Sequence, residues 1–86
     1  MIRVKEDWAQ AVETLEGALA IYREIGDKAG VANVGIALAR GAEERGDLRE
    51  AIGYMEPVAA FGESIGHPNG RVHRAQIEAW RRELGE

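Results

Sequence analysis

The chain has 86 residues, a formal charge of −4 and an isoelectric point near 5.2, which indicate one small acidic domain over residues 1–86. The excess of acidic residues argues against nucleic acid as a partner, because phosphate binding needs a basic face. No cysteine occurs, so disulfides and thiolate metal sites are excluded. No apolar run approaches the roughly 20 residues that span a bilayer, and the N-terminus lacks the apolar core of a signal peptide, so we expect a cytoplasmic protein.

The first expected helix covers residues 6–25. Its apolar residues recur in steps of three and four, which places them on one stripe of a helix. They are Trp8, Ala11, Val12, Leu15, Ala18, Leu19 and Tyr22. We expect Asp7 to cap the start of this helix in a capping box with Gln10, and Gly26 to end it in the left-handed conformation.

The second and third helices are expected over residues 29–45 and 48–65. The second has a narrow apolar stripe lined by small residues, which would let two helices approach closely; the stripe is Val31, Val34, Leu38 and Ala42. Asp47 with Glu50 is a capping box that opens the third helix. Pro57 lies inside the third helix four residues after Gly53, and we interpret the pair as a tolerated kink.

The last helix is expected over residues 70–84, after a break at His67 and Pro68. It carries Ile77, Trp80 and Leu84 among its apolar residues. Every apolar pattern along the chain has a helical period, and no strand is expected. The sequence therefore predicts an all-α fold of about four helices, each antiparallel to the next.

The two halves of the chain repeat each other. Residues 7–46 and 47–86 share nine identities in 40 aligned positions. The shared residues include Ile25 and Gly26 in the first half and Ile65 and Gly66 in the second. A fixed period of this length is typical of solenoids, in which one supersecondary unit stacks on its own copy.

The repeat resembles the tetratricopeptide repeat family. The turn Gly46–Asp47 followed by Ala51 and Met55 is similar to the opening of that family's second helix, and a period near 40 is similar to its longer-helix members. The first-helix signature is degenerate and survives as Gly35, Leu38, Ala39 and Ala42. The resemblance implies a short right-handed stack of helix-turn-helix units, with units over 7–46 and 47–86 and the helices in the order second, first, second, first.

The resemblance also implies a partner groove, because first helices line the concave face in that family. The candidate groove residues are Asn33, Ile36, Arg40 and Glu44 from the second helix with Gln76 and Trp80 from the last. A protein or peptide is the expected partner.

No catalytic, cofactor or metal site is predicted. His67 and His73 with Glu63 imitate a metal site, but a loop histidine and a helix-surface histidine are the simpler interpretation. Ser64 is the only serine and has no evident base. We therefore expect a protein that is not an enzyme.

The preferred functional hypothesis is a scaffold that self-associates as a homodimer through helical ends left uncovered. The candidate residues are Trp8, Val12 and Leu15 at one end and Ile77, Trp80 and Leu84 at the other. Two alternatives stay open at this stage. The chain is either a monomeric module with a peptide-binding groove or one part of a longer repeat protein.

Overall fold

A computed structural model describes residues 4–86, with side chains from Asp7 onward. Four helices occur in it: α1 (Val4–Ile25), α2 (Lys28–Glu44), α3 (Leu48–Ser64) and α4 (Pro68–Glu83). The predicted all-α fold is confirmed, and no strand occurs between residues 4 and 86. Residues 1–3 of the predicted domain lie outside the described residues.

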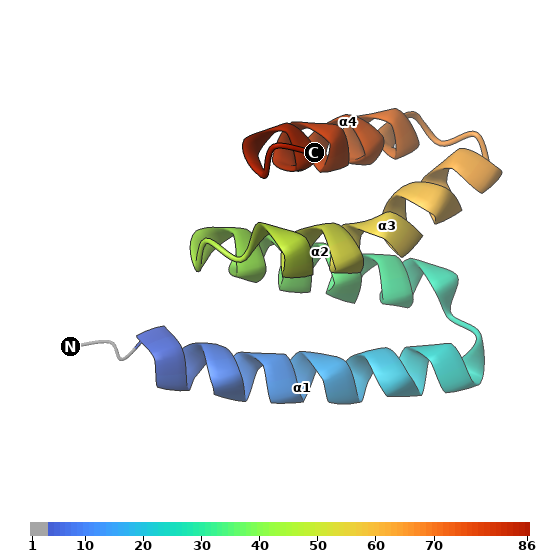
Figure 1. Cartoon of the computed structure of the whole chain (residues 1–86). Helices are drawn as coiled ribbons and strands as arrows, with labels where there is room; N and C mark the ends of the chain where they lie inside the picture. Colours follow the sequence, from blue (N-terminus) through green and yellow to red (C-terminus); the bar gives the residue numbers. More distant parts are fainter. Residues whose placement is uncertain (1–3) are drawn as a thin grey trace.

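The helices stack in chain order, each antiparallel to the next and packed against it (Figure 1). The stack is a flat slab with dimensions of 42 × 37 × 18 Å. α2 and α3 each have a neighbour on two sides, whereas α1 packs on α2 and α4 packs on α3. The core has two parts: one lies between α2, α3 and α4 and includes the fully buried Ile77, and the other lies between α1 and α2 and includes the fully buried Leu38.

Every helix ends in the same way, with a glycine in the left-handed conformation. Gly26, Gly46, Gly66 and Gly85 have φ angles of 75°, 82°, 69° and 82°. The residue after each glycine donates its N–H to a carbonyl five residues back, as Asp27 does to Tyr22 at 2.8 Å, which is the Schellman motif. These glycines are spaced by 20, 20 and 19 residues (46 − 26, 66 − 46, 85 − 66). Two successive helices with the same ending therefore make up one 40-residue period of the sequence.

Side chains cap three of the helices at their starts. Asp27 Oδ1 accepts from the Gly30 N–H at 2.9 Å, Asp47 Oδ1 from the Glu50 N–H at 3.1 Å, and His67 Nδ1 from the Asn69 N–H at 3.0 Å. The cap predicted at Asp47 is confirmed.

Two helices begin two residues earlier than expected, and the cap predicted at Asp7 is wrong. α1 already begins at Val4, so Asp7 lies inside the helix and does not cap it. α4 begins at Pro68 rather than residue 70. Proline is well suited to a first helical position, because the N–H that it lacks would have no partner within the helix.

Two glycines allow the backbones of α3 and α4 to approach each other closely. A Cβ on Gly70 would lie 2.7 Å from the backbone nitrogen of Glu63, and one on Gly62 would lie 2.9 Å from the Gly70 Cα. Any side chain at either position would therefore push the two backbones apart.

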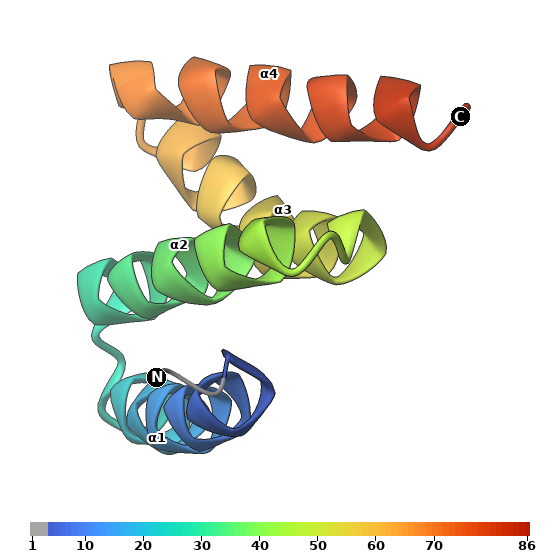
Figure 2. The ribbon, with the colours of Figure 1, turned by 90° about the vertical axis from the view of Figure 1, so that its left-hand side faces the viewer.

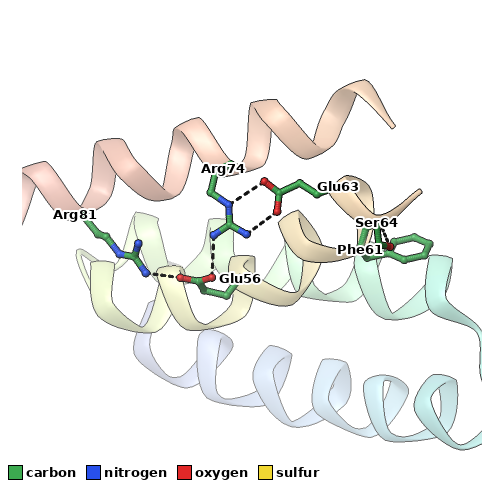
Figure 3. Close-up of polar contacts among 6 residues, drawn as sticks. All are labelled: Glu56, Phe61, Glu63, Ser64, Arg74 and Arg81. Carbon is green, nitrogen blue, oxygen red and sulfur yellow. Dashed lines mark hydrogen bonds and ion pairs between the residues drawn. The ribbon is translucent and has the colours of Figure 1, made fainter. Parts of the chain in front are cut away.

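Two arginines of α4 also join it to α3 through ion pairs (Figure 3). The Arg74 guanidinium donates to both carboxylate oxygens of Glu63, at 2.8 and 3.2 Å, and to Glu56 at 3.0 Å. Arg81 donates to the other oxygen of Glu56. Hydrogen bonding to Arg74 lowers the pKa of Glu63 from its usual value. The pairs lie at the surface, so each contributes little to the stability of the fold.

α3 changes direction partway along its length, and its second half turns toward α4 (Figure 2). Pro57 lies inside this helix and has no N–H to donate to the carbonyl of Gly53. A proline is the ordinary cause of such a bend. The space beside Gly53 is open, since a Cβ there would meet no atom within 4 Å. Pro57 lines two of the hollows described below, both on the side of α3 that faces α1.

Candidate functional site

The first candidate site is the face where α2 and α4 flank α3, here called the α2–α4 face. A hollow of about 310 Å³ on this face contains Asn33 and Ile36 of α2, His73 of α4, and Val58 and Phe61 of α3 in its lining. A smaller hollow of about 70 Å³ shares His73. Its lining includes Arg40, Gln76 and Trp80. Five of the six predicted groove residues thus line two adjoining hollows, although α2 and α4 are separated in sequence by α3.

Glu44, the sixth predicted groove residue, is exposed and lines neither hollow. Trp80 contributes differently from the prediction, since it is 2% exposed and forms part of the floor rather than a free anchor. Its indole Nε1 donates to Glu43 Oε2 at 3.1 Å. This bond links α4 to α2 across α3 and occupies one oxygen of the Glu43 carboxylate.

The α2–α4 face has basic groups above an apolar floor. Arg40, His67 and His73 line the two hollows, and among the described lining residues Glu43 is the single acid. Burial lowers the pKa of His73, and the charges of Arg40 and His67 lower it further. Burial, the larger cause, keeps the His73 imidazole neutral, whereas the smaller contribution from Arg40 has the sign that would favour an anionic group beside it.

The residues predicted for self-association are mostly covered. Ile77 and Trp80 are 0% and 2% exposed, so the prediction that they lie uncovered at a free end is wrong. The reason is that the apolar face of α4 packs on α3, and the buried core extends to both residues. Leu84 is half-buried.

The other predicted end is covered in the same manner, because the stripe of α1 faces α2. Val12 and Leu15 are half-buried against the core residues of α2. The Trp8 ring fills the space left by Gly41, where a Cβ would lie 1.8 Å from the ring. The Arg45 guanidinium lies 5.7 Å from the Trp8 ring centroid, a cation–π distance.

A second hollowed face was not predicted from the sequence. α1 and α3 flank α2 on the side where Glu16, Arg23, Tyr54 and Pro57 gather around a hollow of about 570 Å³. Tyr54 Oη donates to Glu16 Oε1 at 3.1 Å between the two helices. In the sequence, Gly53 and Pro57 indicated an irregular point in α3. No sequence pattern indicated that α1 lies beside this point.

Across residues 4–86, no group of three acidic, histidine or cysteine side chains is placed to hold a metal ion. His67 uses Nδ1 to cap α4. Ser64 Oγ donates to the carbonyl of Phe61 at 2.7 Å (Figure 3). None of the helices in this part of the chain has the length and apolar character to cross a membrane.

Comparisons of the chain with protein-family models, with curated proteins and with solved structures find no match.

Proposed function

We propose that the chain is a non-catalytic protein-interaction module that binds a short segment of a partner on the α2–α4 face. The observation that carries this proposal is the gathering of Asn33, Ile36, Arg40 and Gln76 from two helices around adjoining hollows with an apolar floor. Concave sites lined by apolar groups with a few polar ones are the usual form of binding sites. The resemblance to tetratricopeptide repeats is consistent with this face, since α2 and α4 correspond to first helices.

The partner segment that fits this face is apolar and carries a carboxylate. Ile36, Val58 and Phe61 offer contacts for one or two apolar side chains. Arg40 and His73 lie beside them and can donate to a carboxylate. The carboxylate belongs either to an acidic side chain or to the end of a peptide chain.

Selection of peptides from a displayed random library against the wild-type chain tests this proposal. Enriched peptides are labelled, and their binding is measured by fluorescence polarisation to wild type and to two matched variants. Asn33→Trp fills the larger hollow on the α2–α4 face, and Ala20→Trp places the same side chain at an exposed position on the opposite face. We expect Asn33→Trp to weaken binding by about tenfold or more, equivalent to 1.4 kcal/mol, and Ala20→Trp to leave it unchanged.

A second charge variant makes the test specific. Arg40→Glu should weaken the binding of enriched peptides that carry a carboxylate and leave their amidated or neutral analogues less affected, because the electrostatic contact is lost. If no peptide is enriched, or if all enriched peptides bind Asn33→Trp as they bind wild type, the proposal is wrong.

Self-association is the second candidate function, and it now rests on a different surface. Ile21 and Ile25 lie one turn apart on α1 and are 59% and 68% exposed, so a second copy could cover them. Light scattering across a concentration series measures the mass in solution. A homodimer through this surface predicts that Ile21→Glu with Ile25→Glu lowers the mass to that of one chain. The cytoplasmic location predicted from the sequence stays a prediction.

A further inference from the structure

The face opposite the α2–α4 face contains a longer groove. The hollow of about 570 Å³ continues into one of about 470 Å³, since both include Arg23, Val31, Pro57 and Val58 in their linings. We call the two together the α1–α3 groove: α1 and α3 are its walls and α2 is its floor. It extends along α1 from Glu16 to Gly26, which is about 15 Å at the rise of an α-helix.

Small residues and the bend of α3 explain why the groove stays open. Ala20 and Gly53 lie on the two walls and Gly35 on the floor, so no long side chain fills the middle. Apolar atoms of Leu19 and Val58 line what remains. Pro57 itself lies beside the groove and has no N–H to donate to the carbonyl of Gly53.

The two ends of the groove differ in charge. Glu16 and Glu50 lie at one end, on either side of the Tyr54 hydroxyl. Burial and the nearby Asp47 raise the pKa of Glu50, although its contact with Arg45 at 3.7 Å acts in the opposite direction. Arg23 and Lys28 lie toward the other end, where Asp27 is already used as the cap of α2. The acidic end thus has two carboxylates against the one contact from Arg45, and the basic end has Arg23 and Lys28 against Asp27.

We propose that the α1–α3 groove is a second docking site, which takes a short extended peptide segment of opposite charge order. A lysine or arginine of the segment lies between Glu16 and Glu50, apolar side chains lie over Leu19, Val31 and Val58, and an acidic residue lies near Arg23 and Lys28. At about 3.3 Å per residue, a groove of this length holds four to five extended residues. An arginine suits the acidic end best, because its five N–H groups can donate to both carboxylates.

This site does not rest on the proposed function, since its walls are α1 and α3, although its lining has Ala32, Val58 and Phe61 in common with the lining of the α2–α4 face. One module with two such faces could hold two partner segments at once.

The same peptide library tests the second site. Here Ala20→Trp is the variant that blocks the groove, and Asn33→Trp is the control. Peptides that dock here are those that lose about tenfold or more in affinity to Ala20→Trp and keep their affinity for Asn33→Trp. We expect these peptides to carry a basic residue, then apolar residues, then an acidic residue. Glu16→Lys should weaken them further, because it reverses the charge at the acidic end. Ala60→Trp, at an exposed position in the basic half of the groove, gives a second block if Ala20→Trp fails to fold.

Three results would overturn the inference. One is the absence of any enriched peptide that responds to Ala20→Trp or Ala60→Trp. Another is a set of groove-dependent peptides without a basic residue or with no loss on Glu16→Lys. The third is that Ala20→Trp changes the mass of the chain in solution while no peptide depends on it, which would assign the groove to a second copy. Failure of the proposed function is separate, since it is read from Asn33→Trp and Arg40→Glu.

Discussion

Replacing Gly70 by alanine tests the α3–α4 approach on which the α2–α4 face depends. The new Cβ would lie 2.7 Å from the Glu63 nitrogen and 2.8 Å from the Gly62 carbonyl carbon. Ordinary contact begins near 3.4 Å, so α4 must move away from α3 by at least 0.7 Å (3.4 − 2.7). Because both opposing atoms are backbone, a change of rotamer cannot relieve the overlap.

The expected cost follows from two opposing effects. Overpacking of this kind costs roughly 1–3 kcal/mol. The gain in helix propensity from glycine to alanine is up to about 1 kcal/mol and offsets part of it. We expect Gly70→Ala to lower the free energy of unfolding by about 1–2 kcal/mol, which lowers the melting temperature by about 4–8 °C per kcal/mol in a chain of this size.

Gly17→Ala is the matched control, because Gly17 lies inside α1 and a Cβ there would meet no atom within 4 Å. It should raise the free energy of unfolding by about 0.5–1 kcal/mol. Urea denaturation with equal slopes for wild type and both variants gives the comparison. If Gly70→Ala is as stable as Gly17→Ala, the close backbone approach of α3 and α4 is not present and the argument fails.

Three further predictions concern titration and capping. Burial raises the pKa of Tyr54 to about 12 from 10.0, so the neutral hydroxyl stabilises the fold fully below pH 10, and this stabilisation is lost as the pH rises toward 12. A pH series of urea unfolding should show the loss in wild type and a smaller one in Tyr54→Phe. His73 has a lowered pKa, so its neutral imidazole stabilises the fold above pH 6.5, and this stabilisation is lost as the pH falls below that value. Arg40→Gln should bring the pKa of His73, measured by NMR, back toward 6.5, and an unchanged pKa would contradict the electrostatic role of Arg40. Asp47→Ala removes the cap of α3 and should cost about 1 kcal/mol in thermal unfolding, whereas an unchanged melting temperature would mean that the bond to Glu50 contributes nothing.

The sequence predicts the helices well because the interactions that begin and end them join residues close together in the chain. Gly26 and Gly46 need only a left-handed φ, which glycine adopts without strain, and Asp47 needs only the N–H three residues on. The errors are also local in origin. Asp7 has the composition of a cap but lies one turn inside α1, and Pro68 is equally compatible with a break and with a first helical position.

The candidate site was harder to predict, because periodicity gives the face of a helix but not what covers it. The stripe that places Trp80 on one side of α4 is correct, yet whether that side meets α3 or solvent depends on helix packing between distant segments. The groove residues Asn33 and Arg40 were found through a repeat resemblance, which carries information on the three-dimensional stack. The α1–α3 groove had no such guide, since Glu16 and Tyr54 come together across 38 residues of sequence.

The central claim is that the α2–α4 face binds a partner segment, and NMR titration of the chain with an enriched peptide tests it most directly. The account predicts that the amide signals of Asn33, Ile36 and Gln76 shift on binding, and that the pKa of His73 rises when the peptide carries a carboxylate. Asn33→Trp should abolish both effects at the same peptide concentration. Shifts confined to the residues around Ile21 and Ile25, or no shift at all with peptides that the selection enriched, would contradict it.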